Sequence, residues 1–350
     1  MHRRTLVHFG AVAGVALAHP AFAYSTPIAA KPFADGVTLL VAGPESGATD
    51  RWADLLAPAL GRGLPPGTQL RIEVLGGPDG VTGANRFEVG TAPDGAAAML
   101  VPGSAALAWL VGDPRARFDA AHWVPGLAGT TPGVLASRIP LAALLSGARV
   151  RVGAASAAGP DLPMLLALEL MGVNWEPVFN LTSEAALADA LGRRAVDAVS
   201  LRGRRVPDQA HLFAASGTQP VFTFGAPDDG GALQRDPAFP ALPSAGELIA
   251  QRLAANAALL PAFHAASAAA QLDVALVLPQ LTPAAMVSVW RHACAVAAGS
   301  SEIQAHASVL GVRPLSAPAA NGSTGAIAAD AEVLLELRRW MATRLNYRAA

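Results

Sequence analysis

Three glycine-rich turns hold the residues of this sequence that could do chemistry. They read GPESGATD from Gly43 to Asp50, GGPDGVTG from Gly76 to Gly83, and GAASAAG from Gly153 to Gly159. Each turn follows an apolar stretch typical of a buried strand and leads into a stretch typical of a helix. The first amides of such a helix lack partners within it and carry a partial positive charge. They are suited to bind an anion or a strong hydrogen-bond acceptor.

The candidate ligand-binding residues lie within these turns. They are Pro44, Glu45, Ser46, Gly47, Ala48, Thr49 and Asp50 in the first turn, Pro78, Asp79, Gly80, Val81, Thr82 and Gly83 in the second, and Ala155, Ser156, Ala157 and Ala158 in the third. Thr49 or Asp50 is expected to cap the first helix. Asp50 either orients the turn and reaches ligand through water, or is a first-turn acid favoured by the helix dipole. The turns lack the GxxxxGK[ST] and GxGxxG patterns that hold phosphates, so no nucleotide is expected.

The sequence offers no group of residues for catalysis. Ser156 is not the nucleophile of a GxSxG elbow, because Ala154 and Ala158 stand where that motif needs glycines. The histidines between residues 122 and 306 lack HxxxH or HExxH spacing, so no metal site is expected. Cys294 is the single cysteine, which excludes an internal disulfide, and its apolar surroundings predict a buried, unreactive thiol. We therefore predict a protein that is not an enzyme and has no cofactor.

Composition and charge limit the broad class. The chain has 350 residues, of which 52% are hydrophobic, enough for two cores of ordinary size. Its net charge is -1, and its basic runs are short pairs such as Arg204-Arg205, so a nucleic-acid partner is not expected. The long Ala-rich stretch 253–281 is interrupted by Pro261 and Asp273 and predicts a buried helix rather than a membrane span.

The N-terminus has the pattern of an export signal. Residues 1–23 place two arginines before an apolar stretch and end in Ala21-Phe22-Ala23, a small-x-small cleavage site. The mature chain is therefore expected to begin at Tyr24, outside the cytoplasm, with residues 24–36 as a tether. The segment Arg3-Arg4-Thr5-Leu6-Val7 also resembles a twin-arginine signal, but basic starts are common and the ordinary secretory route is expected.

Strands and helices alternate along the chain, which predicts an α/β fold with parallel βαβ units. The first set of strands and helices is expected at 37–42, 49–60, 69–75, 83–91, 96–101 and 104–111. An apolar stretch broken by Gly and Pro, 123–137, suits a crossover, and a similar set restarts at Arg149. We therefore predict two lobes, each a mainly parallel sheet flanked by helices. Lobe 1 comprises 37–130 plus 277–350, and lobe 2 comprises 131–276. A last helix, 329–345, should pack on a lobe.

Several stretches in this order resemble the Bug-type extracytoplasmic solute-binding proteins, the receptors of tripartite tricarboxylate transporters. The stretch VTLLVAGPESGATDRWADLLAPALGRGL, from Val37, resembles the first strand, loop and Leu-Ala-Pro helix of that family. Thr91 to Gly95 resembles its Ala-Pro-Asp-Gly turn, and PALPSAGEL, from Pro240, resembles its Pro-x-x-Pro-Thr-x-x-Glu turn. The stretch from Val277 to Leu315 is similar to its late strand, Thr-Pro helix and Leu-Gly-x-x-Pro ending.

The resemblance implies a fold, a site and a partner. The expected fold is the two-lobed, type II-like periplasmic-binding fold known as a Venus flytrap, with a small ligand held between the lobes. In the family that ligand is commonly a carboxylate, bound by backbone amides and small polar groups of the first two turns and covered by the second lobe. The implied partners are membrane transporter subunits, and the chain is expected to be a periplasmic monomer.

The sequence also departs from the family pattern. Glu45 stands in the first turn, so either its side chain faces solvent or the ligand is neutral or cationic. The third turn has Gly159-Pro160-Asp161 in place of a Ser- and His-containing run, and Phe179 to Thr182 replaces a Tyr-Lys-Gly motif. The main hypothesis is a receptor for a small polar, carboxylate-like or amide-like metabolite. The alternative is a flytrap protein that signals to a membrane partner, as a sensor or scaffold, with weak or no solute binding.

Overall fold

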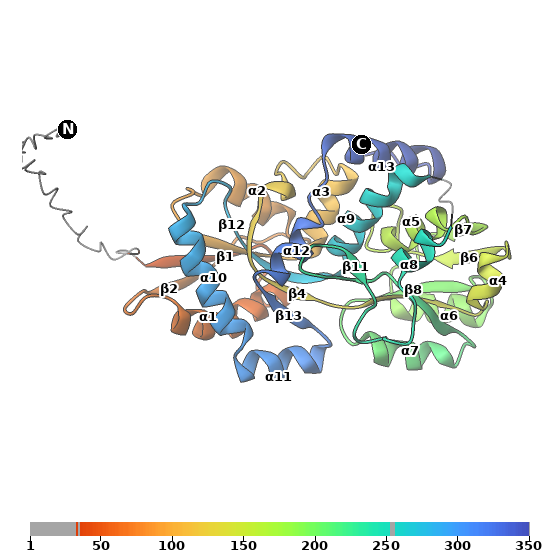
Figure 1. Cartoon of the computed structure of the whole chain (residues 1–350), viewed down its shortest axis with the longest axis horizontal. Coiled ribbons are helices and arrows are strands. Elements are labelled where there is room, and N and C mark those ends of the chain that lie inside the picture. Colours follow the sequence, from red (N-terminus) through yellow and green to blue (C-terminus); the bar gives the residue numbers. More distant parts are fainter. Residues whose placement is uncertain (1–32, 34–35, 253–255, 350) are drawn as a thin grey trace, which may run out of the picture. The chain divides into compact units, whose positions relative to one another are not determined.

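The computed structural model describes residue 33 and residues 36–252 and 256–349 (Figure 1). The predicted signal peptide, 1–23, lies outside the described residues, as does the predicted tether except residues 33 and 36. Residues 33–350 form one compact unit, and the account below concerns that unit.

The first sheet has six strands in the order β13-β4-β12-β3-β1-β2. Its strands are β1 (Val37–Val41), β2 (Leu70–Val74), β3 (Ala97–Val101), β4 (Val124–Thr130), β12 (Leu272–Leu278) and β13 (Arg313–Ser316). Strand β1 pairs in parallel with β2 and β3, whereas the pairings β12-β3, β12-β4 and β13-β4 are antiparallel. The carboxyl ends of β1, β2 and β3 therefore meet at one edge, where the first two glycine-rich turns begin.

Helices cover both faces of the first sheet because its central strands β1, β3 and β12 are apolar on both sides. Leu39 and Val41 pack into one core with α1, α10 and α11, whereas Leu40 and Met99 pack into another with α2, α3 and α9. These helices are α1 (Ala48–Gly63), α2 (Val81–Gly90), α3 (Gly103–Val111), α9 (Leu260–Gln271), α10 (Ala284–Ala298) and α11 (Ser301–Leu310). The alternation along β1 thus separates two cores on the two faces of one sheet.

The second sheet has five strands in the order β7-β6-β8-β5-β9. Its strands are β5 (Gly133–Ser137), β6 (Val150–Gly153), β7 (Trp175–Val178), β8 (Ala198–Arg202) and β9 (Gln219–Thr223). Strand β6 pairs in parallel with β7 and β8, and β5 pairs antiparallel with β8 and β9. The associated helices are α4 (Leu141–Leu145), α5 (Leu162–Leu170), α6 (Glu184–Gly192) and α7 (Val206–Ala214). We call each sheet with its helices a lobe.

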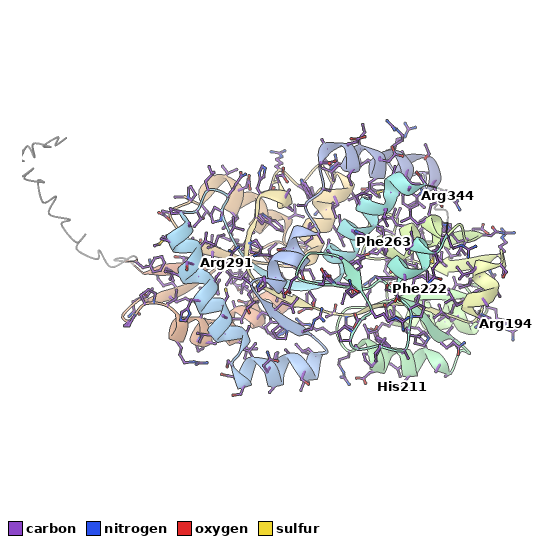
Figure 2. All side chains as sticks on the ribbon, viewed as in Figure 1. Arg194, His211, Phe222, Phe263, Arg291 and Arg344 are labelled. Atoms are coloured by element: carbon purple, nitrogen blue, oxygen red, sulfur yellow. The ribbon has the colours of Figure 1, made fainter. Side chains whose placement is uncertain are left out.

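The remaining elements join the two lobes or extend from them. They are the 3₁₀ turns η1 (Ala120–His122) and η2 (Ala257–Leu259), the short pair β10 (Ala226–Pro227) and β11 (Leu233–Gln234), and helices α8 (Ala245–Ala250), α12 (Ala319–Gly325) and α13 (Ala331–Arg344). Helix α13 packs on α3 and α9, as expected for the predicted last helix. Its Arg344 lies over the ring of Trp175, 4.3 Å from the centroid (Figure 2).

One hydrophobic core is shared by the two lobes, and two others are not. The shared core contains α3, α9 and α5, and it includes the fully buried Phe222 of β9 and Phe263 of α9 (Figure 2). On the other face, the first sheet has its own core with α1, α10 and α11. The second sheet likewise has a separate core there, which contains Val206 and Phe213 of α7. Apolar packing therefore joins the lobes on one face only.

The predicted α/β class and two-lobed fold are confirmed, but the sheets are mixed rather than mainly parallel. The reason is that β12 runs antiparallel to its neighbours β3 and β4, and β5 runs antiparallel to its neighbours β8 and β9. Strand β12 includes residues 276 and 277, between which the lobe boundary was expected, so it belongs to the first sheet over its whole length. None of the helices in the described residues is long and apolar enough to span a membrane.

Candidate functional site

The first two glycine-rich turns are packed against each other at the carboxyl edge of the first sheet. A Cβ atom at Gly83 would lie 2.6 Å from the Cα atom of Ala42, so only glycine permits this approach. Gly80 has a φ of +82°, and a Cβ there would lie 2.7 Å from Cδ of Pro102. The glycines at 80 and 83 therefore place the start of α2 beside the turn that leads into α1.

Helix α1 begins without a side-chain cap. Its cap position is Gly47, so the expectation that Thr49 or Asp50 caps the helix is wrong. Asp50 instead accepts a hydrogen bond from the amide of Ser46 (2.7 Å), while the amide of Gly47 donates to the carbonyl of Pro44 (3.0 Å). Within the described residues, the amides of Ala48 and Thr49 donate to no recorded acceptor. The side chain of Thr49 is buried in the first lobe, whereas Ala48 is exposed.

The rest of the first turn faces solvent. Pro44, Glu45 and Ser46 are exposed. Ser46 has a φ of 57°, a conformation that the hydrogen bond from its amide to Asp50 supports. The guanidinium of Arg51 donates to the carbonyl of Ser46 (2.6 Å). The turn is therefore fixed by its own residues, and the exposure of Glu45 matches the first of the two alternatives given for it.

Helix α2 also begins without a side-chain cap, at Gly80. The amide of Val81 donates to Oδ1 of Asp79 (3.2 Å), whereas those of Thr82 and Gly83 have no recorded acceptor in the described residues. Asp79 also forms an ion pair with Arg115 (2.8 Å). Two helix N-termini with unpaired amides therefore lie close together, an arrangement that favours negative charge or a strong acceptor.

A third helix, α3, begins at this edge in close contact with other parts of the chain. A Cβ atom at Gly103, the first residue of α3, would collide with the carbonyl oxygens of Ala269 and Leu272. The end of α9 and the start of β12 thus cover α3. Ser104 donates to the carbonyl of Asp79 (2.8 Å), which ties α3 to the second turn. Helix α3 also begins without a side-chain cap, and the amides of Gly103 and Ser104 have no recorded acceptor in the described residues.

The third glycine-rich turn uses its polar groups internally. The amide of Ala155 donates to Oδ2 of Asp161 (2.8 Å), whose side chain is only 5% exposed. Arg202, at the end of β8, forms an ion pair with Oδ1 of the same carboxylate (3.0 Å). At the start of α5, the amide of Leu162 donates to the carbonyl of Gly159 (3.0 Å), and Pro163 has no N–H. Helix α5 therefore offers fewer free amides than α1.

The predicted residues of the third turn differ in exposure. Ser156 is exposed, Ala157 is buried, and Ala155 and Ala158 are half-buried. No recorded hydrogen bond joins these described residues to the first or second turn. The structure thus brings the first two predicted turns together, and links the third to them only through other side chains.

Those linking side chains were missed by the sequence analysis. Arg204 donates to both oxygens of Asp273, at 2.9 and 2.8 Å, and Trp52 of α1 donates to Oδ2 of Asp273 at 2.7 Å. Arg202 and Arg204 are two residues apart, so one short segment carries both contacts. Arg202 pairs with Asp161 of the third turn, and Arg204 pairs with Asp273, which also accepts the hydrogen bond from Trp52. The available signal was the basic run from Arg202 to Arg205 directly after a predicted strand, where parallel strands place functional residues.

The cavities found among the described residues lie away from the predicted turns. One of about 460 Å³ is lined by Glu73, Arg86 and Asp94 among others, and one of about 450 Å³ by residues that include His264. A smaller cavity of about 120 Å³ is lined by Thr131 and Asp236 where the chain crosses between the lobes. Burial raises the pKa of Asp236 despite the hydrogen bond from the amide of Ala238.

The described residues contain no group of three or more His, Cys, Asp or Glu side chains that could hold a metal ion. Cys294 is buried on α10, and burial raises its pKa to about 12. The predicted burial of this thiol is confirmed, and its raised pKa disfavours the nucleophilic thiolate.

Comparisons with known proteins identify the fold. No protein-family profile and no curated relative matches this sequence. Among solved structures, a TctC solute-binding protein from Polaromonas, without ligand, has a TM-score of 0.64 at 16% identity, over 87% of this chain and 97% of that chain. The chain therefore has the fold of a periplasmic solute-binding protein. This likeness agrees with the one expected from the sequence motifs.

Two further solved structures have lower scores. MatC from Rhodopseudomonas palustris, with bound malate, has a TM-score of 0.46 at 20% identity, over 87% of this chain and 97% of that one. A second Rhodopseudomonas palustris protein, with adipate, has a TM-score of 0.49 at 18% identity, with the same coverage of both chains. The assignment of the fold rests on the Polaromonas protein.

Proposed function

We propose that this chain is a Bug-type extracytoplasmic solute-binding protein. In this proposal residues 1–23 direct export to the periplasm, and the mature chain captures a small polar metabolite between its lobes. It then presents the metabolite to the membrane subunits of a tripartite tricarboxylate-type transporter, and it acts as a monomer without catalysis. The sequence motifs and the solute-binding fold support this proposal from two independent directions.

One observation carries the binding role. Helices α1 and α2 both begin without side-chain caps, and Gly83 packs the start of α2 against Ala42, at the beginning of the turn that leads into α1. Helix N-termini are ordinarily capped by Ser, Thr, Asp or Asn side chains, which contribute about 1 kcal/mol. Two neighbouring ends without caps leave donors that a carboxylate or an amide oxygen can satisfy. The proposed contacts are the amides of Ala48, Thr49, Thr82 and Gly83.

The departures from the family pattern limit the ligand class. In the third turn, the amide of Ala155 donates a hydrogen bond to the buried carboxylate of Asp161. Arg202 and Arg204 are each paired with an acid of the chain. The second lobe therefore offers mainly shape and small groups such as Ser156. A ligand with one acceptor group, carboxylate-like or amide-like, fits this arrangement.

A thermal-shift and calorimetric screen tests the proposal. The mature chain is screened against carboxylates, amino acids, nicotinamide-type amides and sugars, and at least one ligand should raise the melting temperature. The variant Ala48→Pro removes one proposed donor, and proline is tolerated at the first position of a helix. We expect it to weaken binding about tenfold to a hundredfold, the effect of losing one hydrogen bond to a charged group.

A matched control exists at another helix. Ala331→Pro makes the same change at the first residue of α13, after a cap residue with nearly the same backbone angles. It should leave ligand affinity unchanged. If both variants bind the screened ligand as tightly as the natural chain, the α1 amides are not the site.

The alternative is a flytrap protein that signals to a membrane partner with little solute binding. The internal pairing of Asp161 with Ala155 and Arg202 favours it, because a second-lobe turn occupied by its own side chains has fewer groups for ligand. A folded chain that no compound of the screen stabilises would support this alternative against the receptor.

A further inference from the structure

Asp273 is directed out of its strand by a β-bulge. Leu272 and Val274 of β12 face the adjacent residues Thr130 and Gly129 of β4, so Asp273 has no partner between them. A bulge of this kind re-aims a side chain. The carboxylate of Asp273 reaches Trp52 of α1, and its side chain is only 13% exposed.

The partner of this carboxylate comes from the other lobe. Arg204 follows β8 of the second sheet, and its guanidinium grips both carboxylate oxygens at 2.8 and 2.9 Å. The next residue, Arg205, donates its amide to the carbonyl of Leu310 at the end of α11 (2.9 Å). One short segment, 203–205, therefore makes a side-chain contact and a backbone contact with the first lobe.

These contacts lie on the face where the lobes share no core. On the opposite face, α9 joins α3 of the first lobe to α5 of the second through one apolar core. On the Arg204 face, the cores of α1 and α7 are separate. Figure 1 shows α9 and α13 along the upper side, and α7 and α11 along the lower side. Apolar packing thus holds one side, and polar contacts hold the other.

We propose that Arg204 and Asp273 are positioning residues that hold the second lobe against the start of α1. Bidentate Arg–carboxylate pairs are directional as well as strong, so the pair fixes an orientation and not only a distance. Trp52 lies one turn into α1, so the same pair sets the position of segment 203–205 relative to the amides of Ala48 and Thr49. The shared core around α9 then acts as the hinge side. The pair joins two residues of the chain itself, so only its effect on solute affinity rests on the proposed function.

Distances between the lobes test the inference directly. Val89→Cys on α2 and Leu212→Cys on α7 place spin labels on side chains that are 86% and 70% exposed. The natural Cys294 is buried and its pKa is raised to about 12, so it should not react. Pulsed electron paramagnetic resonance on the labelled chain without added ligand should give one narrow distance distribution. Asp273→Asn should broaden that distribution and shift it to another distance.

Arg204→Gln provides a second variant on the more exposed side of the pair, where its side chain is 24% exposed and folding should tolerate the change. Arg204→Lys should restore part of the narrow distribution because it restores the charge. Asp208→Asn is the matched control, since it breaks the neighbouring pair Arg205–Asp208, which lies within the second lobe. Circular dichroism confirms that each variant is folded.

Unchanged distributions in folded Asp273→Asn and Arg204→Gln chains would overturn the positioning role, whether or not any solute binds. Loss of solute binding without a change in distance would also overturn it.

Discussion

The facing edges of the two sheets are built by different chemistry. At the edge of the first sheet, Gly80 and Gly83 allow backbones to touch, and two helices begin without caps. At the edge of the second sheet, the turn before α5 is fixed by the buried carboxylate of Asp161, which bonds to Ala155 and Arg202. The first edge leaves donors unpaired, whereas the second satisfies its polar groups within the chain.

Under the proposed function, this difference separates a binding edge from a supporting edge. A close backbone approach positions amides without using them, so they stay available to a ligand. Paired charges are hydrogen-bonded within the chain, so they make the turn rigid and are not available to a ligand. The first lobe is therefore expected to determine which head group binds, and the second lobe to determine how the site is covered. The following predictions test this contrast, from the largest expected effect to the smallest.

Asp161→Ala should destabilise the second lobe most. The change leaves the amide of Ala155 and the guanidinium of Arg202 without their partner, and breaking a buried pair costs about 3 kcal/mol. Urea unfolding measures the loss. Asp189→Ala is the control, because it removes the exposed pair with Arg193 and should cost less than about 1 kcal/mol. Equal losses in the two variants would refute the supporting role of Asp161.

Gly83→Ala should destabilise the first edge by about 1–3 kcal/mol, because the added methyl group meets the backbone of Ala42. It should also weaken solute binding, since it separates the two helix N-termini. Gly90→Ala lies on the same helix with no atom within 4 Å of the new methyl group. That control should be neutral or stabilising by about 0.5–1 kcal/mol. Urea unfolding and calorimetry measure both variants. A Gly83→Ala chain with unchanged stability and unchanged solute affinity would contradict the role given to the first edge.

The pH dependence of stability should also differ between changes made in the two sheets. Burial alone would raise the pKa of Asp197, but its hydrogen bonds from Arg151 outweigh that effect and the pKa is lowered. A carboxyl whose folded pKa is lowered stabilises the protein above its unfolded pKa, and that contribution is lost as pH falls through the folded value.

Asp197→Asn should therefore reduce the loss of stability in acid by less than about 1 kcal/mol, since the pair is partly exposed. Denaturant unfolding between neutral pH and acid measures the difference. Gly83→Ala should show the same pH dependence as the natural chain, because its effect is steric. An acid dependence that Asp197→Asn leaves intact would show that this pair does not contribute.

The fold and the first two turns could be predicted from sequence because their signals are local. Apolar strands such as Val37–Val41, followed by Gly-rich turns and amphipathic helices, predict both the elements and the edge where they meet. The cap of α1 could not be predicted correctly, because Asp50 turns back to the amide of Ser46 and leaves Gly47 at the cap position.

The contact between the lobes could not be predicted, because it depends on long-range geometry. Arg204 and Asp273 are 69 residues apart, and Asp273 and Trp52 are 221 apart. Their meeting requires the bulge in β12, which no local pattern marks. The sequence also predicts no helix or strand in segment 203–223, which contains α7 and β9.

Amide resonances of the mature, ¹⁵N-labelled chain test the central claim most directly. A compound that raises the melting temperature is titrated into the chain while its amide signals are followed. We predict that the largest shifts fall on Ala48, Thr49, Thr82 and Gly83, with smaller shifts at Ser156. A stabilising ligand that moves other amides and leaves these in place would contradict the assignment of the α1 and α2 N-termini as the binding edge.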